Sequence, residues 1–208
     1  MTHAAPESTR ERRLRKRRDE VALAAIRLFD QRGFDAVTVD EIAEAADIAP
    51  RTFFRYFATK EDVFFTDRTE RLAALRDTIA ARPTDEPILA SVRHAILAIA
   101  DQYGIDSEQK LLSARVLADT PSLRAATIVR QTEWEQAVAE MVGDRLGVDP
   151  ADDLRPHVVA STTLAALRSA MDMWVAGDGR ADLMALANQA LDLLDGGLHH
   201  VSDAGRPT

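Results

Sequence analysis

The chain has 208 residues, of which 46% are hydrophobic and 29% are charged, and its net charge at pH 7 is −8. This composition is typical of a globular protein and excludes a disordered or fibrous chain. The absence of cysteine excludes a disulfide framework, and no apolar run approaches the length of a membrane span. The basic N-terminus is not followed by the apolar segment of a signal peptide, so we expect a cytoplasmic protein that contacts no membrane.

The charge is divided unevenly along the chain. Residues 1–60 contain 12 Lys and Arg against 10 Asp and Glu, a net charge of +2, whereas the remainder contains 14 against 24, a net charge of −10. The basic residues are densest before residue 19 and include Arg15, Arg17 and Arg18. Such a run is commonly a solvated tail, but beside a DNA-binding motif it contacts phosphates or enters the minor groove. We therefore expect residues 1–16 to form a basic arm.

A helix-turn-helix pattern occupies residues 17–65. Apolar residues recur at helical spacing from Val21 to Phe29, and Gly33 is placed to end that helix. Thr38 and Glu41 have the spacing of a capping box at the start of the next helix. Only a few residues separate this helix from another that begins at Pro50. Two helices joined so closely predict a helix-turn-helix, and therefore DNA binding.

The segment from Pro50 to Phe57 has the pattern of a recognition helix. Phe53 and Phe57 lie one turn apart and are expected to point inward. The other faces carry donors suited to bases or phosphates, namely Arg51, Thr52, Arg55 and Tyr56. The alternative is an aromatic core helix, which two arginines among the aromatic residues disfavour.

Six pairs of residues in this region resemble the DNA-binding domain of the tetracycline-repressor (TetR) family: Gly33-Phe34, Thr38-Val39, Ile42-Ala43, Thr52-Phe53, Tyr56-Phe57 and Lys60-Glu61. The resemblance implies that Thr38 meets a phosphate and that Arg51 and Thr52 face bases. It also implies that Tyr56 and Lys60 hold the DNA backbone. The expected DNA-binding residues are Arg15, Arg17, Arg18, Thr38, Arg51, Thr52, Phe54, Arg55, Tyr56 and Lys60.

Three positions depart from the family pattern. Asp47 stands where the family usually has a glycine in the turn, and aspartate tolerates the left-handed conformation better than most residues. Ala49 replaces the usual hydroxyl at the N-cap of the recognition helix. Phe54 replaces a tyrosine that often donates to phosphate. The replacements at Ala49 and Phe54 each remove one polar contact of the family pattern.

The rest of the chain alternates helical stripes with short breaks and has no strand pattern, so we expect an all-α protein of about nine helices. A connecting helix is expected from about Lys60 to Ala81. Later helices are expected at residues 121–146, 154–176 and 182–194. Residues 66–197 would form a helical effector-binding and dimerisation domain, followed by a disordered tail at 198–208.

The last two helices carry apolar stripes that fit either an intramolecular core or an association surface, and both uses are compatible. Proteins with this resemblance form a four-helix bundle with a second copy through these helices. A homodimer reads two half-sites of a palindromic operator about 34 Å apart. The expected interface residues are Leu164, Leu167, Met171, Trp174, Leu186, Ala190 and Leu193.

The second domain is larger than dimerisation requires, and the resemblance implies a small-molecule pocket among its helices. Polar or amphipathic residues on apolar helices are the candidates: Tyr103, Arg115, Arg130 and Trp134. The arginines could instead pair with nearby carboxylates. Residues 51–57 together with 130–135 resemble an actinobacterial subgroup that responds to acyl-coenzyme A-like ligands, including mycofactocin-type regulators. The net charge of −10 opposes coenzyme A at long range, so a fatty acid or another amphiphile also remains open.

No phosphate-binding glycine loop, zinc-protease motif or nucleophile elbow occurs. His94 fits a packing role better than a ligand role, and we expect no enzyme, metal ion or cofactor. Two functions remain. One is a transcriptional regulator, most simply a repressor, that responds to a ligand. The other is a DNA-binding or interaction protein without a small-molecule effector, and a filled core in place of a cavity would favour it.

Overall fold

The computed structural model describes residues 9–66, 68–102 and 107–197. Within these ranges the chain forms nine α-helices and one 3-10 helix, without any β-strand, as the sequence predicts. None of the described helices is long and apolar enough to cross a membrane. The helices belong to two compact units. Residues up to 68 and residues 112–124 form the first, and residues 69–111 and 125 onward form the second.

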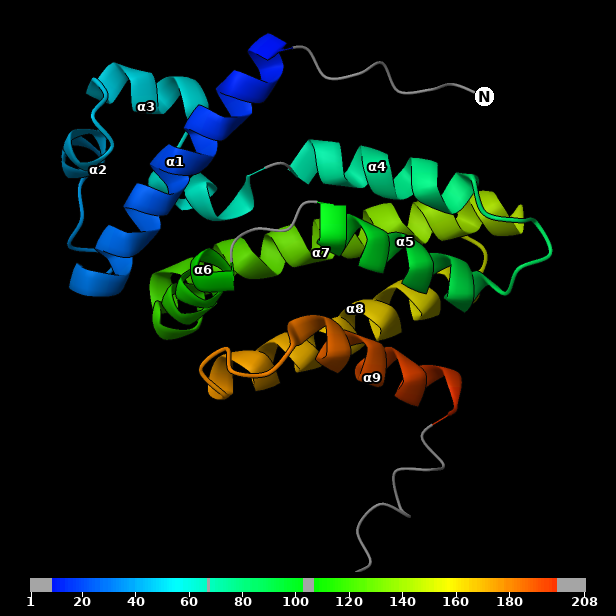
Figure 1. Ribbon diagram of the computed structural model, residues 1–208. Helices are drawn as coiled ribbons and strands as arrows, with labels where there is room; N and C mark the ends of the chain where they lie inside the picture. Colours follow the sequence, from blue (N-terminus) through cyan, green and yellow to red (C-terminus); the bar gives the residue numbers. More distant parts are fainter. Residues whose placement is uncertain (1–8, 67, 103–106, 198–208) are drawn as a thin grey trace, which may run out of the picture. The chain divides into compact units, whose positions relative to one another are not determined.

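The first unit begins with α1 (Thr9–Arg32), followed by α2 (Val39–Ala45), α3 (Pro50–Tyr56) and η1 (Lys60–Phe65), as Figure 1 shows. The expected basic arm is therefore helical from Thr9 onward, and its first eight residues lie outside the described part of the chain. Helix α1 ends because Gly33 adopts a φ of 81°. The amide of Gly33 donates to the carbonyl of Phe29 at 2.8 Å, which satisfies a terminal carbonyl of the helix.

Aromatic residues fill the core of the first unit. Phe29 and Phe34 meet edge to face with ring centroids 4.9 Å apart, and Ile42 and Phe53 are fully buried beside them. Val116 from α6 (Ser107–Asp119) and Leu123 from α7 (Pro121–Leu146) are buried in the same cluster. This contact explains why residues 112–124 belong to the first unit, although the sequence analysis placed them in the second domain.

The second unit contains α4 (Arg68–Ala80), α5 (Ile88–Gln102), most of α7, α8 (Leu154–Ala176) and α9 (Leu183–Asp195). The bounds of α7, α8 and α9 agree with the sequence to within a residue. The single connecting helix expected from Lys60 to Ala81 is wrong, because the chain forms η1 and then α4 as separate helices. At the end of η1, Thr66 has a ψ of 151°, which is an extended conformation and interrupts helical hydrogen bonding.

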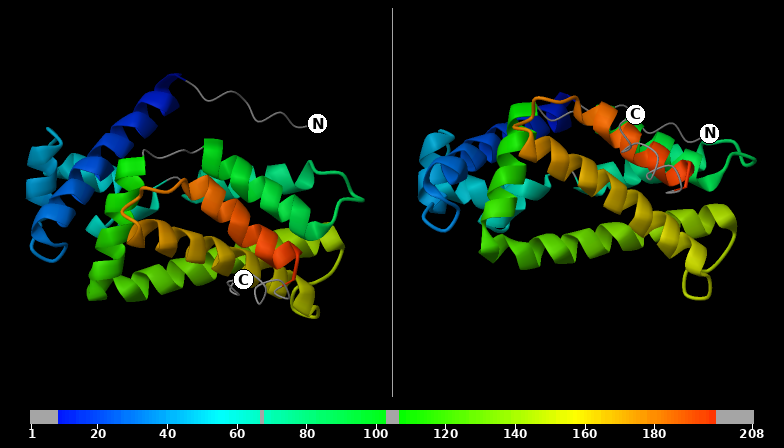
Figure 2. Two further views of the ribbon diagram at one scale, coloured as in Figure 1. Left: turned by 60° about the horizontal axis from the view of Figure 1, so that its bottom comes forward. Right: turned by 90° about the horizontal axis from the view of Figure 1, so that it is seen from below.

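Helices α8 and α9 run alongside each other in an antiparallel pair, as the two views of Figure 2 show. Asp153 caps the start of α8, and Asp182 caps α9 by accepting from the amides of Met184 and Ala185. Between the helices, Asp178 and Gly179 adopt positive φ values of 57° and 70°. The break expected between the helices at 154–176 and 182–194 is thereby confirmed.

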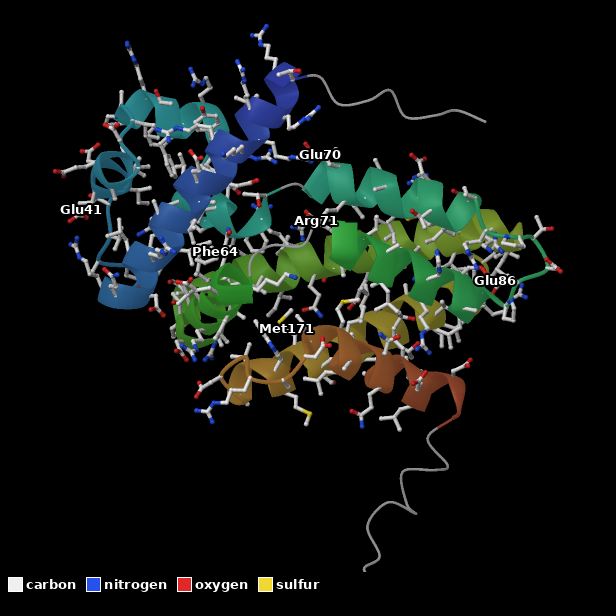
Figure 3. All side chains as sticks on the ribbon, viewed as in Figure 1. Glu41, Phe64, Glu70, Arg71, Glu86 and Met171 are labelled. Atoms are coloured by element: carbon white, nitrogen blue, oxygen red, sulfur yellow. The ribbon has the colours of Figure 1, made fainter. Side chains whose placement is uncertain are left out.

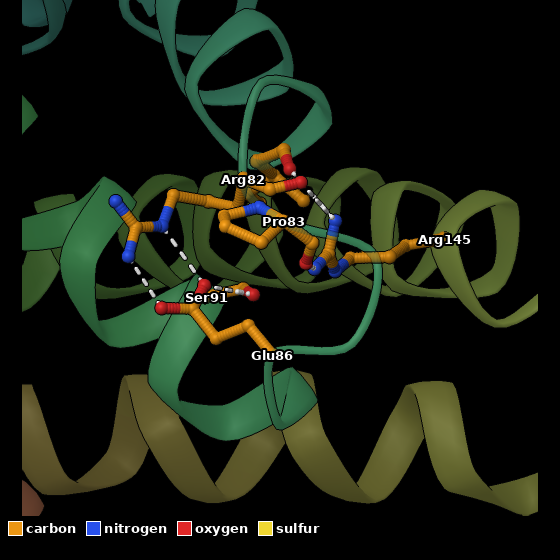
Figure 4. A network of polar contacts seen from close by, with 6 residues as sticks. Arg82, Pro83, Glu86, Ser91 and Arg145 are labelled. Carbon is orange, nitrogen blue, oxygen red and sulfur yellow. Dashed lines mark hydrogen bonds and ion pairs between the residues drawn. The ribbon is translucent and has the colours of Figure 1, made fainter.

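A polar network holds the loop between α4 and α5 (Figure 4). Nη1 of Arg145, near the end of α7, donates to the carbonyls of Ile79 at 3.3 Å and Arg82 at 3.2 Å, and Nη2 donates to that of Pro83. In the same loop the carboxylate of Glu86 accepts from Nε of Arg82 at 2.8 Å. Because Ile79 lies in the last turn of α4 and Arg82 and Pro83 follow it, Arg145 caps that helix and joins its C-terminus to α7.

Candidate nucleic-acid interface and effector cavity

A capping box fixes the start of α2, as the sequence predicts. The amide of Glu41 donates to Oγ1 of Thr38 at 3.3 Å, and the amide of Thr38 donates to Oε2 of Glu41 at 2.8 Å. Arg32 at the end of α1 donates to Oε1 of the same carboxylate at 2.7 Å. The hydrogen bond from the Thr38 backbone, followed by that from Arg32, lowers the pKa of Glu41 to about 2. Since the Thr38 hydroxyl itself donates to Glu41, a phosphate would have to compete for it.

Asp47 forms the turn between α2 and α3 with a φ of 51°, so it occupies the left-handed region that favours glycine and that aspartate tolerates better than most residues. Nη2 of Arg17 on α1 donates to the carbonyls of Ala46 at 3.0 Å and Asp47 at 3.2 Å. Nη1 donates to Glu20 at 2.9 Å. Arg17 was expected to bind DNA, but in the structure its guanidinium caps the end of α2 and holds the turn.

Helix α3 presents the expected division between buried and exposed side chains. Phe53 is 0% exposed and Phe57 is buried, whereas Phe54 is 57% exposed. Arg51 is also exposed, and the guanidinium of Arg55 lies 5.1 Å from the ring centroid of Tyr56. Nη2 of Arg55 donates to the Tyr56 hydroxyl at 3.2 Å, which orders both side chains on the same face. As expected from Ala49, no side chain caps the start of α3.

Lys60, which was expected to hold the DNA backbone, makes contacts within the first unit. Its Nζ donates to the carbonyls of Phe34 at 2.8 Å and Val37 at 3.1 Å, and it lies 4.2 Å from the centroid of the Phe34 ring. Lys60 is the first residue of η1 and faces the loop between α1 and α2. Two of the three hydrogen-bond donors of its ammonium are therefore used within the protein. The more accessible cations lie on α1, where Arg15 and Arg18 are half-buried and Arg10, Arg12, Arg13 and Lys16 are exposed.

A cavity of about 490 Å³ lies within the second unit, among α5, the first turns of α6, α8 and the start of α9. Its wall is mainly apolar, and Met171, labelled in Figure 3, reaches into it from α8. Lys110 on α6 and Asp182 at the cap of α9 add charged groups. The remaining lining residues are Ile96, Leu97, Ala100, Leu167, Trp174, Gly179, Ala181, Leu183, Met184 and Ala187.

The residues that the sequence analysis suggested for a pocket do not line this cavity. Tyr103 lies outside the described residues, and Arg115 belongs to the first unit. Arg130 and Trp134 belong to the second unit, where Trp134 packs against the buried core around Val138. Lys110 was not among the expected residues, because no local pattern marks a single lysine near the start of a helix as part of a cavity wall.

The expected interface residues separate into two groups. Trp174 is 3% exposed and its Nε1 donates to the carbonyl of Ala181 at 3.0 Å, so its place at a subunit interface is corrected to the interior of the second unit. Leu167 and Met171 also line the cavity, and Leu164 packs against the buried core around Val138. Leu186 and Ala190 are half-buried, whereas Leu193 is exposed. The larger exposed apolar residues of α8, which the stripe did not identify, are Leu154, Val158 and Met173.

Comparison with known proteins identifies the family. Residues 23–66 match the family model for bacterial regulatory proteins of the tetR family, and residues 86–199 match that of the MftR C-terminal domain. The chain belongs to the TetR family. It is therefore a transcriptional regulator, with a DNA-binding helix-turn-helix in its first unit. Its second half is a TetR-type C-terminal domain of the MftR group.

Individual TetR proteins agree with this result. The transcriptional regulator TcmR of Streptomyces glaucescens is 33% identical over 171 residues, which are 79% of this chain and 76% of TcmR. The putative mycofactocin biosynthesis regulator MftR of Mycobacterium tuberculosis is 32% identical over 178 residues, 86% of this chain and 89% of MftR. Among solved structures, Thermus thermophilus FadR in complex with lauroyl-CoA has a TM-score of 0.54 at 25% identity, covering 92% of this chain and 99% of FadR.

Proposed function

We propose that this regulator is a dimeric repressor that leaves its operator when an acyl amphiphile enters the cavity of the second unit. The cavity itself is the observation that carries the proposal. A volume of about 490 Å³ with a mainly apolar wall lies within the usual range for small-molecule sites. The lauroyl-CoA bound to FadR supports an acyl chain as the apolar part of the ligand.

The exposed side of α3 is the proposed surface for base recognition. Arg51 and Thr52 at its start would contact base edges in the major groove, where a bidentate arginine identifies guanine. Arg55 and Tyr56, already joined by a hydrogen bond, would meet the phosphates together. The exposed cations near the start of α1 would add contacts that do not depend on sequence.

A second copy would pack on the exposed apolar side chains of α8 and α9. Leu154 is 73% exposed and Met173 is 65% exposed, and Val158 and Leu193 are exposed as well. These large apolar side chains, on two adjacent helices, would be covered by the same surface of a second subunit. The two subunits would then form a closed pair with two-fold symmetry. Two recognition helices could then read a palindromic operator in the cytoplasm, and no enzymatic step is involved.

Release follows if the ligand binds a non-docking conformation more tightly than the docking one. Helix α4 follows η1 of the helix-turn-helix unit directly in the chain, and Arg145 joins its other end to α7. A ligand that moves α5 or α8 would therefore change the position of α4 through the second unit. Because both half-sites must be met together, a small rotation of each subunit would lower operator affinity strongly.

Operator titration tests this function. Duplexes selected from a random pool by the purified protein would serve as operators, and their affinity would be measured by fluorescence anisotropy with dodecanoyl-CoA, dodecanoate and dodecanol. The proposal predicts that at least one of these compounds weakens operator binding. If none changes the affinity, the alternative of a DNA-binding protein without a small-molecule effector is correct.

The earlier pocket candidates on α7 can be tested in the same titration. Arg130→Ala and Trp134→Ala should keep their response to the effector, because neither residue lines the cavity. Loss of the response in both variants, with ligand-free operator affinity intact, would move the effector site to α7.

A further inference from the structure

The cavity of the second unit has one basic group on its wall. Lys110, near the start of α6, lines it together with apolar side chains of α5 and α8. Among the described residues no carboxylate forms an ion pair with Lys110 that would neutralise its ammonium. The other charged lining residue is Asp182, but its Oδ1 accepts from the amides of Met184 at 2.8 Å and Ala185 at 3.3 Å. The Asp182 charge is therefore directed to the start of α9.

The surroundings of Lys110 make its positive charge costly. Burial is the main factor that lowers its pKa from the usual value, and the neighbouring charge of Arg71 lowers it further. Arg71 lies in the first turns of α4, as Figure 3 shows, so two helices bring positive charge to this side of the second unit. An unneutralised cation on an apolar wall is stabilised when an anion binds beside it. The anion compensates for the hydration that the ammonium loses on burial.

The apolar part of the wall suits an unbranched chain. Leu167 and Met171 lie one turn apart on α8, and Ile96 and Ala100 lie one turn apart on α5. Methionine adapts its shape to an apolar ligand more readily than branched residues do. Near the last turn of α8, the position of Gly179 leaves room for only a hydrogen, since a Cβ there would lie 3.1 Å from Leu111 and 3.2 Å from Trp174. The volume of about 490 Å³ limits the length of chain that the cavity accepts.

We infer that the ligand of this cavity is a monoanionic carboxylate with a medium-length alkyl chain, and that Lys110 binds its carboxylate. This inference rests on the proposed function and specifies the head group of the effector. A single lysine balances one negative charge, whereas coenzyme A brings several phosphate charges to a part of the chain whose net charge is strongly negative. The carboxylate would accept a charge-assisted hydrogen bond from Nζ of Lys110, and the chain would lie between Leu167 and Ile96.

The test compares three ligands that share one chain, namely dodecanoate, dodecanol and dodecanoyl-CoA, by titration calorimetry on the full-length protein. Dodecanoate should bind wild type at least about ten-fold more tightly than dodecanol, as expected for a hydrogen bond to a charged group. Lys110→Met should remove this difference and leave dodecanol binding nearly unchanged, whereas Lys110→Arg should retain a preference for the acid. Circular dichroism of each variant establishes that it is folded.

Arg180→Met is the matched control, because Arg180 is an exposed cation directly between the lining residues Gly179 and Ala181. It should keep the full preference for dodecanoate, and an equal loss in this variant would mean that general electrostatics, not Lys110, selects the acid.

Equal binding of acid and alcohol to wild type would overturn the inference and leave the proposed function standing. Tightest binding of dodecanoyl-CoA would overturn it in favour of a coenzyme A thioester. If no ligand binds, both the inference and the acyl effector are wrong.

Discussion

Arg17 on α1 donates a hydrogen bond to the backbone carbonyl of Asp47, with 3.2 Å between Nη2 and the oxygen. Asp47 is the left-handed residue on which the turn between α2 and α3 depends. A residue of the basic N-terminal segment therefore supports the geometry of the helix-turn-helix in addition to any contact with DNA. The placement of α3 depends on α1 as well as on the short turn itself.

Replacing Arg17 by Gln should shift the urea unfolding midpoint to lower concentration, because the carbonyls of Ala46 and Asp47 lose a charged donor. Operator affinity should fall by a similar factor on preferred and random duplexes, since the change affects the position of α3 and not a base contact. Lys16→Gln removes a neighbouring exposed charge and should leave the midpoint unchanged. Equal midpoints for wild type and Arg17→Gln would show that the hydrogen bonds from Arg17 to the turn do not stabilise the first unit.

The exposed cations of α1 should make DNA affinity depend steeply on salt. Each phosphate contact contributes roughly 0.9 to the slope of log affinity against log salt. The triple variant Arg10→Gln, Arg13→Gln, Lys16→Gln should therefore flatten the slope by about one to three, depending on how many of the three cations contact phosphates. An unchanged slope would mean that the start of α1 lies away from the DNA.

Arg51→Ala should lose about 1 to 3 kcal/mol of binding free energy on the selected operator and much less on random DNA, because a bidentate base contact discriminates between sequences. Anisotropy titrations on both duplexes measure the two losses. Equal losses would place Arg51 on the phosphate backbone instead.

Acid should weaken the start of α2. The folded pKa of Glu41 is about 2, below its ordinary value of 4.5, so the carboxylate stabilises the folded state above pH 4.5. That contribution is lost as the pH falls from about 4.5 toward 2. Wild type should therefore be more stable than Glu41→Gln at pH 7, and the difference should shrink below pH 4.5 in denaturant titrations. Glu44→Gln, on an exposed position of the same helix, is the control for the loss of a carboxylate from α2.

Two adjacent residues of α8 should respond differently to substitution. Met173→Asp places a charge on the proposed subunit interface and should convert the dimer to a folded monomer in sedimentation experiments. Trp174→Ala removes a buried side chain and should cost roughly 3 to 5 kcal/mol of unfolding free energy. A Met173→Asp protein that stays dimeric would move the interface away from this face of α8.

Local signals in the sequence were sufficient for much of this fold. The capping box of Thr38, the breaker Gly33 and the Thr120-Pro121 helix start all act within a few residues, so they could be recognised without the structure. The break between η1 and α4 carries no such signal, because the residues around Thr66 are neither glycine nor proline. Periodicity alone therefore predicted one helix where the chain forms two.

The sites were harder to predict because they depend on contacts between distant segments. Arg17 and Lys60 belong to patterns that suggest DNA contacts, yet both donate to carbonyls elsewhere in the first unit. Trp174 shares an apolar stripe with residues that could face a second subunit, and only the turn around Gly179 shows that it faces inward. An amphipathic pattern identifies an apolar face but not which surface covers it.

If occupation of the cavity controls operator binding, a variant that fills the cavity should lose its response to the ligand. Ala100 lines the cavity on α5, so Ala100→Phe should block the site while leaving the recognition helix untouched. Operator affinity would be measured by anisotropy for both proteins with and without saturating dodecanoate. Dodecanoate should weaken operator binding by wild type. It should have no effect on operator binding by Ala100→Phe, provided that this variant is folded and binds the operator normally without ligand. Equal release of both proteins by dodecanoate would show that the cavity does not control operator binding.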